Sequence, residues 1–376
     1  MQKNVLVLSC NTGQGHNSAA RAVTEAFLAH GARCEMRDAL SFASENVSRI
    51  ISKSYIGVAV KAPKVFQLLY EAGGFISSDK HRSIVYAVNC AYAGALCEYI
   101  LSEKFDAVVA PHLFPAEALT HMRKREMTQV KWYAVATDYT CIPFWEETQP
   151  DQFFIPHASL AGEFSERGIL SEHLCATGIP VCRAFCEKLP RREARARLSL
   201  PLEGRMYLVM SGSMGFGNLE KITDPLLAAC GEEDCVVVIC GNNVSLLETL
   251  TERYRENQRM VVIGYTDQAA IYMDACDVLL TKPGGLTSTE AAVKNVPLVH
   301  TAPIPGCETA NRNFFRQNGL SLSGETYEEC AAAAVALAWD EKRQETMLEA
   351  QRRSINPKAA DEICSFVLRE CGGAPI

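Results

Sequence analysis

A glycine-rich turn in the stretch TKPGGLTSTEAA follows the apolar run DACDVLL and could seat a phosphate group. Gly284 and Gly285 let the backbone approach a ligand closely, and the start of the following helix presents N–H groups to an anion. Glu290, farther into that helix, could accept hydrogen bonds from hydroxyl groups. A purely structural interpretation is also open, because Pro and Gly are common between a strand and a helix, and Thr287 or Ser288 would cap the helix.

A second glycine turn, in SCNTGQGHNSAARAV, carries a histidine. Gly13 and Gly15 permit a tight turn, and His16 would project into the crevice outside the carboxyl ends of the strands. A neutral imidazole there could take a proton from an incoming hydroxyl. The glycines make half of the dinucleotide fingerprint G-x-G-x-x-G, but Ser18 holds its third position. A solvent-facing histidine at a helix start is the structural alternative.

Polar loops also follow the predicted strands in the second half of the sequence. Gly212, Gly215 and Gly217 form a loop suited to anions, and no Lys-Ser or Lys-Thr follows them, which argues against a Walker A ATPase or kinase. The stretch APIPGCETANRNFF adds a Pro-Gly turn followed by Glu308 and Asn311. Strand ends of one parallel sheet share an edge, so we expect one crevice there, for a ligand with phosphates and hydroxyls. The sequence shows no carboxylate cluster with metal-ligand spacing, so no metal is expected.

The elements that must position these loops are alternating strands and helices. Apolar runs predict strands at NVLVLSC, FDAVVAPH, VKWYAVATD and DQFFIPH, and then at RMYLVMSG, CVVVICG, RMVVIGY, DVLLTKPG and VPLVHTA. Such strands, alternating with helices, indicate an α/β class with parallel sheets covered on both sides. The 376 residues suggest two domains, which we expect over residues 1–180 and 181–356, joined by a linker within 177–201 and followed by a helix within 357–376.

Composition narrows the class of protein. The formal charge of −7 argues against nucleic acid as the main partner. The 16 cysteines include no C-x-x-C pair and fall mostly in apolar segments, which favours buried free thiols in a reducing cytoplasm. The N-terminus is typical of a first strand rather than a signal peptide, and no apolar stretch reaches the ~18 residues that a membrane-spanning helix needs.

Residues 42–100 break the alternation with several helical stretches. The cations Arg49, Lys53, Lys61 and Lys64 are interleaved there with apolar residues and with no carboxylate between them. A basic amphipathic insertion of this kind can lie on an anionic bilayer. The alternative is a helical cover over the first sheet, with solvated lysines.

The order of the motifs resembles the diacylglycerol glycosyltransferases of bacteria and plants. This is the monogalactosyldiacylglycerol synthase group, of GT-B family 28 type and related to the MurG-type transferases. The resemblance covers nearly the whole chain and rests on GQGH, TDY followed by Trp, TGIPV, SGSMG, CGNN, GY, KPGGLTSTEA and PGCETAN. It implies a GT-B fold, in which two Rossmann-like domains face each other across a cleft. The N-terminal domain would bind the lipid acceptor, the C-terminal domain would bind a UDP-sugar, and the terminal helix would cross back onto the first domain.

The resemblance also implies roles for single residues. His16 is a candidate base or acceptor-binding residue, with Asp138 as its rival. Gly15 and Trp145 would belong to the acceptor side. The donor-binding residues would be Gly212, Ser213, Met214, Gly215, Gly241, Asn243, Tyr265, Lys282, Gly284, Gly285, Thr287, Ser288, Glu290, Cys307, Glu308 and Asn311.

Some of the implied roles concern the glycine turn at residues 284 and 285. In addition, two positions of the chain depart from the family pattern. Gly284 and Gly285 would seat the diphosphate, and Glu290 would hold the ribose hydroxyls. Cys307 stands where the family usually has a Gln, and a thiol cannot present a comparable amide to a sugar hydroxyl. Ile142 stands where the pattern has a His. The first departure concerns the specificity for the sugar, and the second concerns the acceptor side of the site.

The implied reaction is an inverting transfer of a hexose from a UDP-sugar to diacylglycerol. It would take place at the inner face of the cell membrane, with the protein cytoplasmic and peripherally bound to an anionic surface. No cofactor other than the donor substrate, no metal and no nucleic acid is expected. Three alternatives are a MurG-like transferase acting on a polyprenyl-linked or other lipid acceptor, a UDP-sugar epimerase of the same architecture, and a UDP-sugar-binding sensor without turnover.

Overall fold

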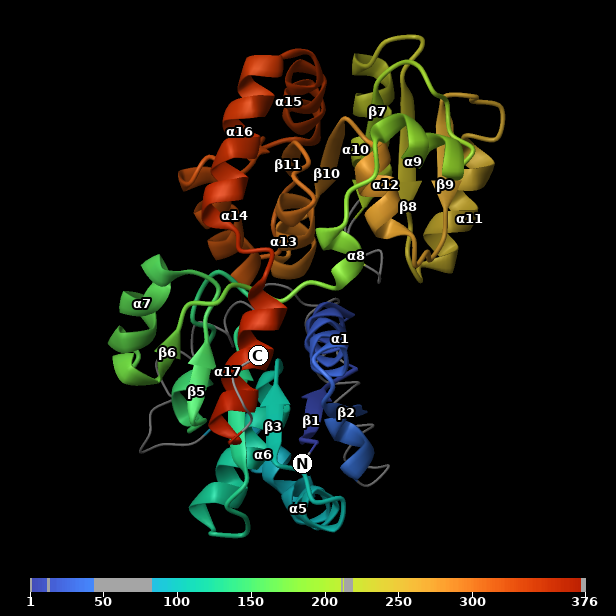
Figure 1. The fold of residues 1–376 in the computed structure, drawn as a ribbon. Coiled ribbons are helices and arrows are strands. Elements are labelled where there is room, and N and C mark those ends of the chain that lie inside the picture. Colours follow the sequence, from blue (N-terminus) through green and yellow to red (C-terminus); the bar gives the residue numbers. More distant parts are fainter. Residues whose placement is uncertain (1, 12–13, 44–82, 211, 213–218, 373–376) are drawn as a thin grey trace. The chain divides into compact units, whose positions relative to one another are not determined.

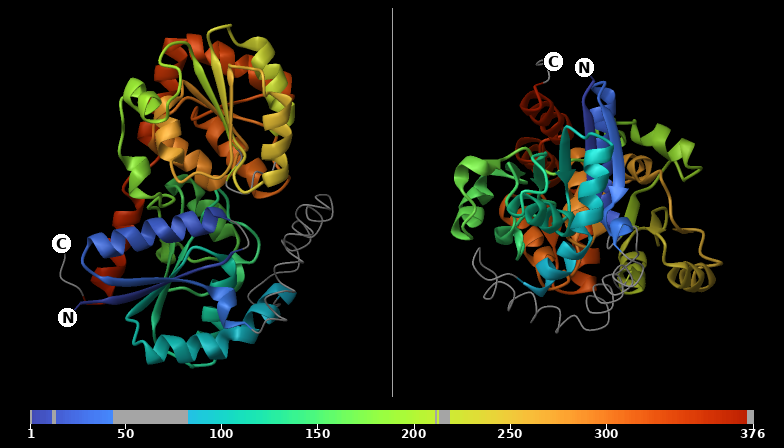
Figure 2. Two further views of the ribbon diagram at one scale, coloured as in Figure 1. Left: turned by 90° about the vertical axis from the view of Figure 1, so that its right-hand side faces the viewer. Right: turned by 90° about the horizontal axis from the view of Figure 1, so that it is seen from below.

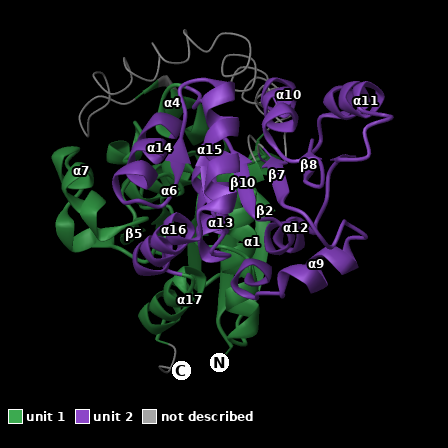
Figure 3. Ribbon diagram, turned by 90° about the horizontal axis from the view of Figure 1, so that it is seen from above, with its two compact units in different colours: residues 1–182, 305–307, 357–376 green, residues 183–304, 308–356 purple. Residues whose placement is uncertain are grey.

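The computed structural model describes residues 2–11, 14–43, 83–210, 212 and 219–372 (Figure 1). The predicted α/β class is confirmed, because the described chain forms two six-stranded sheets whose strand pairs are parallel, with helices on both faces of each sheet (Figure 2). Contacts divide the chain into two compact units (Figure 3). Unit 1 comprises residues 1–182, 305–307 and 357–376, and unit 2 comprises residues 183–304 and 308–356.

Unit 1 contains the first sheet, with the strand order β2-β1-β3-β4-β5-β6. Its strands are β1 Asn4–Ser9, β2 Arg33–Asp38, β3 Ala107–Ala110, β4 Lys131–Val135, β5 Gln152–Phe154 and β6 Leu174–Cys175. Its α-helices are α1 Gln14–Ala29, α4 Ile84–Asn89, α5 Ala93–Ser102, α6 Leu113–Lys124, α7 Ala161–Glu166 and α17 Ala359–Glu370. Short 3-10 turns lie at Ala39–Phe42, Cys90–Tyr92, Trp145–Glu147, Ala158–Leu160 and Ser171–His173.

Both faces of this sheet are buried, which explains its unbroken apolar strands. Successive side chains of a strand point to opposite faces, so Val5 and Val7 join one core cluster and Leu6 and Leu8 join the other. The first cluster contains side chains of α1 and α17, and the second contains side chains of α5 and α6. A strand that is buried on both sides has no polar face to show in its sequence.

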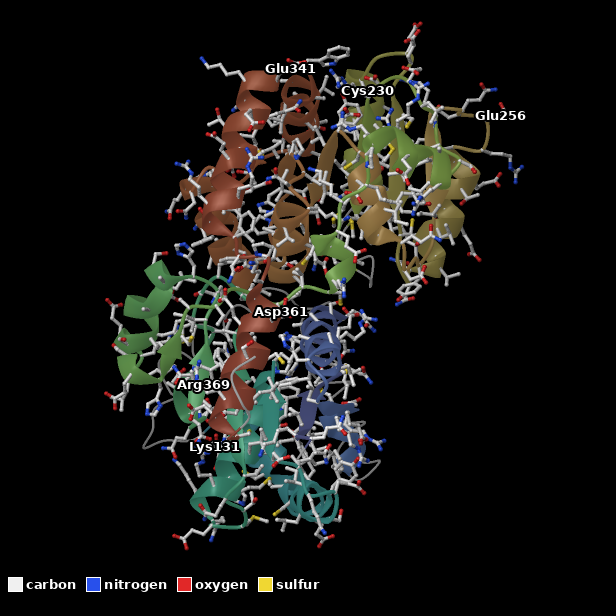
Figure 4. All side chains as sticks on the ribbon, viewed as in Figure 1. Lys131, Cys230, Glu256, Glu341, Asp361 and Arg369 are labelled. Atoms are coloured by element: carbon white, nitrogen blue, oxygen red, sulfur yellow. The ribbon has the colours of Figure 1, made fainter. Side chains whose placement is uncertain are left out.

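The C-terminal helix α17 is part of unit 1 and packs on α1. Its apolar side chains Ile363 and Val367 are fully buried in the core cluster of β1. At its first turn, Asp361 pairs with His30 at 3.1 Å, and at its end the Glu370 carboxylate pairs with Lys131 at 3.1 Å (Figure 4). The hydrophobic face therefore holds the helix, and the exposed pairs contribute little to that attachment.

The longest strand of unit 1 that the sequence did not predict is β2, RCEMRD. It lies at the edge of the sheet and pairs with β1 alone. Four of its six residues are charged and none is fully buried, so it lacks the apolar run that marks the inner strands. The two-residue strands β6 and β12 were also missed, because so short an element has no pattern of its own.

Unit 2 contains the second sheet, with the order β12-β11-β10-β7-β8-β9. The strands are β7 Met206–Met210, β8 Cys235–Ile239, β9 Met260–Ile263, β10 Val278–Thr281, β11 Leu298–His300 and β12 Leu322–Ser323. The helices are α8 Arg183–Cys186, α9 Arg191–Arg197, α10 Leu219–Ala229, α11 Val244–Arg253, α12 Ala269–Ala275, α13 Gly285–Val293, α14 Cys307–Gln317, α15 Tyr327–Trp339 and α16 Glu341–Ser354. All five strands predicted for this half are present.

The boundary between the two units, after Cys182, lies within residues 177–201, the segment expected to be a linker, and most of that segment is folded into unit 2. Arg195, on α9, is 3% exposed, and its Nη2 donates to Asp277 Oδ2 at 2.7 Å. Its Nε donates to the carbonyl of Ala275 at 3.0 Å. The sequence does not reveal this buried pair, because the acid that pairs with Arg195 comes 82 positions later in the chain.

Candidate active site

Loops from three neighbouring strands of unit 1 meet at the carboxyl edge of its sheet. His16 lies in the first turn of α1, after β1. Pro111 and His112 follow β3, and Thr137 and Asp138 follow β4. The Nδ1 atom of His16 lies 2.9 Å from the carbonyl oxygen of Pro111 and 3.0 Å from Oγ1 of Thr137. The structure thus brings His16 to the loop that holds its predicted rival, Asp138.

The contacts of His16 determine which of its nitrogens is basic. A carbonyl oxygen only accepts hydrogen bonds, so Nδ1 carries the proton that it donates to Pro111, and we assign the lone pair of the neutral ring to Nε2. Burial lowers the pKa of His16, and the nearby Asp138 carboxylate opposes this shift only in part. The imidazole is therefore neutral at pH 7, with Nε2 able to accept a proton.

A second imidazole, that of His112, packs against His16. The two ring centroids are 4.4 Å apart with an interplanar angle of 69°. Nδ1 of His112 accepts a hydrogen bond from the backbone N–H of Phe114 at 3.0 Å and so caps α6. Burial and the neighbouring His16 hold the pKa of His112 well below its usual value. The pair is thus uncharged at neutral pH.

A chain of side-chain hydrogen bonds fixes the start of α1. Ser9 Oγ donates to Asn17 Oδ1 at 2.6 Å, and Asn17 Nδ2 donates to Asn11 Oδ1 at 2.7 Å. Asn11 Nδ2 then donates to Asp38 Oδ2 at 2.7 Å, at the end of β2. Asn17 and His112 were not predicted from the sequence; the one signal was that each is a polar residue beside the end of an apolar strand.

The residues predicted on the acceptor side lie in different environments. Gly15 is half-buried in the first turn of α1. Trp145 is 3% exposed and packs edge-on against Phe153 at a centroid distance of 5.8 Å, so it supports the loop after β4 from within the core. Ile142 is partly buried against the same core cluster. The predicted membrane-binding cations lie outside the described residues: Arg49, Lys53, Lys61 and Lys64.

The turn after β10 in unit 2 has the form of an anion seat. Helix α13 begins at Gly285, so the expectation that Thr287 or Ser288 caps it is wrong, and Gly284 is the N-cap. Gly284 makes no side-chain cap, and a Cβ added to it would meet no described atom within 4 Å. The first amides of a helix have no partner inside the helix, so they can bind an anion here.

Helix α14 is attached to this turn by two contacts. Nζ of Lys282 lies 2.8 Å from Oε1 of Glu308, and Nδ2 of the buried Asn311 donates to the carbonyl of Pro283 at 3.1 Å. The other carboxylate oxygen of Glu308 accepts a hydrogen bond from the N–H of Ile304 at 2.8 Å. Three of the predicted donor-binding side chains are therefore linked to the glycine turn.

The loops after β7, β8 and β9 end at the same edge of this sheet. Gly212 and Gly241 have positive φ angles of 69° and 59°, which glycine adopts without strain. Asn243 caps α11 by accepting a hydrogen bond from Leu246 N at 3.1 Å. Tyr265 is 57% exposed after β9. The strand order β10-β7-β8-β9 places these loops in a row beside the anion seat.

Other predicted donor-binding residues are buried or lie outside the described part. Ser288 is fully buried, and its Oγ lies 2.9 Å from Nε2 of His300, so it supports α13 from the core side. Glu290 is 8% exposed, while Thr287 and Cys307 are half-buried. The residues Ser213, Met214 and Gly215 are not described.

His300 connects α13 to the strand beyond it. Its Nδ1 lies 3.1 Å from Oγ of Ser321, opposite the contact with Ser288. Burial, with a smaller contribution from Arg312, lowers the pKa of His300 to about 3. The neutral ring therefore joins two serines inside unit 2.

Among the residues that the structure describes, no group of three or more His, Cys, Asp or Glu side chains could hold a metal ion. No helix within the same ranges is long and apolar enough to cross a membrane.

Residues 16–181 match the sequence model of the monogalactosyldiacylglycerol (MGDG) synthase family. The processive diacylglycerol beta-glucosyltransferase of Bacillus subtilis (strain 168) is 26% identical, over 98% of this chain and 95% of the relative. The enzyme of the same name from Bacillus licheniformis is also 26% identical, over 92% and 89%. These matches confirm the resemblance seen in the motifs.

Solved structures match almost the whole chain. MurG of Acinetobacter baumannii has a TM-score of 0.62 at 15% identity, covering 98% of this chain and 99% of MurG. HepE of Anabaena in complex with UDP-glucose has a TM-score of 0.59 at 11% identity, covering 98% and 99%. At these identities the likeness concerns the fold alone, and it confirms the predicted GT-B type.

Proposed function

Because residues 16–181 match the sequence model of the MGDG synthase family, we propose that the chain is a glycosyltransferase that transfers a hexose from a UDP-sugar to diacylglycerol. The relatives named processive diacylglycerol beta-glucosyltransferases, at 26% identity, support this acceptor. The product is a glycolipid, formed with inversion at the anomeric carbon at the cytoplasmic face of the membrane.

The single observation that carries the mechanism is the hydrogen bond from His16 Nδ1 to Pro111 O. It leaves Nε2 as the basic nitrogen, which takes the proton of the lipid hydroxyl as its oxygen bonds to the anomeric carbon. The bond from that carbon to the diphosphate oxygen breaks on the opposite side, so the configuration inverts. Asp138 raises the pKa of His16 and so stabilises the imidazolium that forms. Such proton transfer contributes typically about 10²–10⁴ in rate.

Unit 2 receives the leaving group. The first backbone amides of α13, from Gly285 onward, lie at a helix start without a side-chain cap, which suits the charge that develops on the departing diphosphate. The N–H of Gly284 itself donates to the carbonyl of Lys282 at 2.8 Å. Donors fixed in advance need not reorganise during the reaction, so they favour the transition state. Glu290, farther into the same helix, holds the ribose hydroxyls.

The test is mass spectrometry of lipids after the purified chain is incubated with anionic liposomes that contain diacylglycerol. UDP-glucose, UDP-galactose and UDP-N-acetylglucosamine are supplied separately, because Cys307 replaces the amide that would read the sugar. We expect a hexosyl-diacylglycerol with one donor and none with the His16→Asn variant. UDP binding without any lipid product would favour a sensor, and a product on a polyprenyl-linked acceptor alone would favour a MurG-like transferase.

We also propose that the basic stretch between residues 49 and 64 binds the anionic membrane surface. Each cation near such a surface contributes about 1 kcal/mol, so replacing four by Gln should weaken liposome binding strongly and in a salt-dependent way. The variant carries Gln at Arg49, Lys53, Lys61 and Lys64. A control carries Gln at four exposed arginines elsewhere: Arg33, Arg183, Arg192 and Arg255. Equal liposome binding by both variants would contradict this role.

A further inference from the structure

The ion pair between Lys282 and Glu308 lies directly beside the anion seat of unit 2. Lys282 is the residue that precedes the Pro-Gly-Gly turn, and Glu308 is in the first turn of α14. The two side chains are 21% and 11% exposed, and their charged atoms are 2.8 Å apart. Water therefore screens this pair less than it screens the exposed pairs of the surface.

Glu308 creates an electrostatic problem for the site. A carboxylate close to a diphosphate repels it, and the repulsion is strong where burial limits screening. Glu308 is also held in place, because its Oε2 accepts the hydrogen bond from Ile304 N. The carboxylate is thus fixed between a backbone amide on one oxygen and the ammonium of Lys282 on the other.

The backbone on both sides of the pair is fixed as well. Asn311 is fully buried on α14, and its amide binds the carbonyl of Pro283, the residue between Lys282 and the first glycine. The hydrogen bonds of Asn311 and Ile304 therefore hold the backbone near Lys282 and Glu308 together.

We propose that Lys282 is a positioning residue that neutralises Glu308, so that a carboxylate able to bind sugar hydroxyls can stand beside an anionic sugar nucleotide. This inference rests on the proposed function, since it takes the UDP-sugar as the ligand of the seat. The competing role, a direct contact of Lys282 with the diphosphate, predicts a different double-mutant result.

The test is a double-mutant cycle with UDP as the probe, measured by calorimetry at pH 7.5. Lys282→Met alone should weaken UDP binding by about tenfold or more, because it leaves Glu308 uncompensated. In a Glu308→Gln background the same change should cost less than about threefold, because no carboxylate needs neutralising. Lys282→Arg, which keeps the charge, should bind UDP nearly as the wild type does. An equal loss from Lys282→Met in both backgrounds would overturn the proposal in favour of direct contact.

These outcomes are separable from those of the proposed function. The cycle measures donor binding alone, so coupling between Lys282 and Glu308 without a lipid product would retain this inference and reject only the acceptor. Wild-type protein that binds neither UDP nor UDP-glucose would overturn both. Thermal unfolding of each variant checks that the fold is retained, and Lys282→Gln replaces Lys282→Met if the latter does not fold.

Discussion

Replacing His16 with Asn separates the base from the hydrogen bond that holds it. The amide nitrogen of Asn is as many bonds from the backbone as Nδ1 of His, so it can still donate to the carbonyl of Pro111. Nε2, the nitrogen that accepts the proton, is lost. The variant therefore removes the proposed chemistry and retains the local contact.

The two expected effects differ in size. If His16 is the general base, kcat should fall by about 10²–10⁴, which corresponds to about 2.7–5.5 kcal/mol in the activation barrier. The free energy of unfolding should change by no more than about 1 kcal/mol, because the bond to Pro111 remains and only ring contacts with His112 are lost. The assays are initial rates of glycolipid formation at saturating donor and urea-induced unfolding.

A matched control keeps the base and removes its second neighbour. Thr137→Val deletes the hydroxyl 3.0 Å from Nδ1 of His16, so kcat should fall by less than about tenfold, the equivalent of one ordinary hydrogen bond. A His16→Asn variant that keeps kcat within tenfold of the wild type would refute the role of His16 as the base.

The lowered pKa of His16 fixes the sign of the pH dependence of kcat. Only neutral His16 can accept a proton, and burial lowers its pKa below 6.5, so kcat should fall as the pH drops through that lowered pKa. Asp138 raises the pKa of His16, so Asp138→Asn should move the acid limb of the profile to still lower pH. A limb that moves to higher pH, or that persists unchanged in His16→Asn, would contradict the assignment.

Further predictions concern unit 2. Gly284→Ala should weaken UDP binding by about tenfold while changing stability by less than about 1 kcal/mol, because the Cβ would enter the seat and meets no described atom; calorimetry and urea unfolding measure the two. Asp277→Asn should lower the free energy of unfolding, measured with urea, by about 3 kcal/mol, since it leaves the buried Arg195 without its counter-charge. Glu203→Gln removes one partner of an exposed ion pair and should not change that free energy measurably. Because the pKa of His300 is lowered to about 3, stability should fall as the pH drops below 6.5, by up to about 1.4 kcal/mol per pH unit, and His300→Gln should flatten this dependence.

The inner strands could be predicted from the sequence, and the edges could not. Strands such as β8, CVVVI, are buried on both faces, so their unbroken apolar sequence predicts an inner strand. β2 is at an edge, none of its six residues is fully buried, and four of them are charged. A pattern based on apolar runs cannot detect such an element, although pairing with β1 stabilises it.

The turns could be predicted because their residues lie close together in the sequence. Contacts between residues far apart in the sequence could not be predicted. The glycines and His16 stand within a few residues of a strand end, which is enough to place them at the carboxyl edge. The partner of His16, Pro111, is 95 positions away, and only the strand order brings them together. Asp277 and Arg195 show the same limit, since they are 82 positions apart in the chain and only the fold brings them into contact.

The proposed roles of the two units depend on protons in different ways, and this separates their contributions in kinetics. In unit 1, His16 and His112 are neutral because burial lowers their pKa values, so the proposed base is a group that titrates in acid. In unit 2, the anion seat at Gly284 consists of backbone amides, which do not titrate. We therefore expect kcat to fall with acid while the Kd for UDP-glucose stays constant over the same range. A parallel loss of donor affinity would mean that a titrating group belongs to the seat, and the amides of α13 would then be insufficient to explain donor binding.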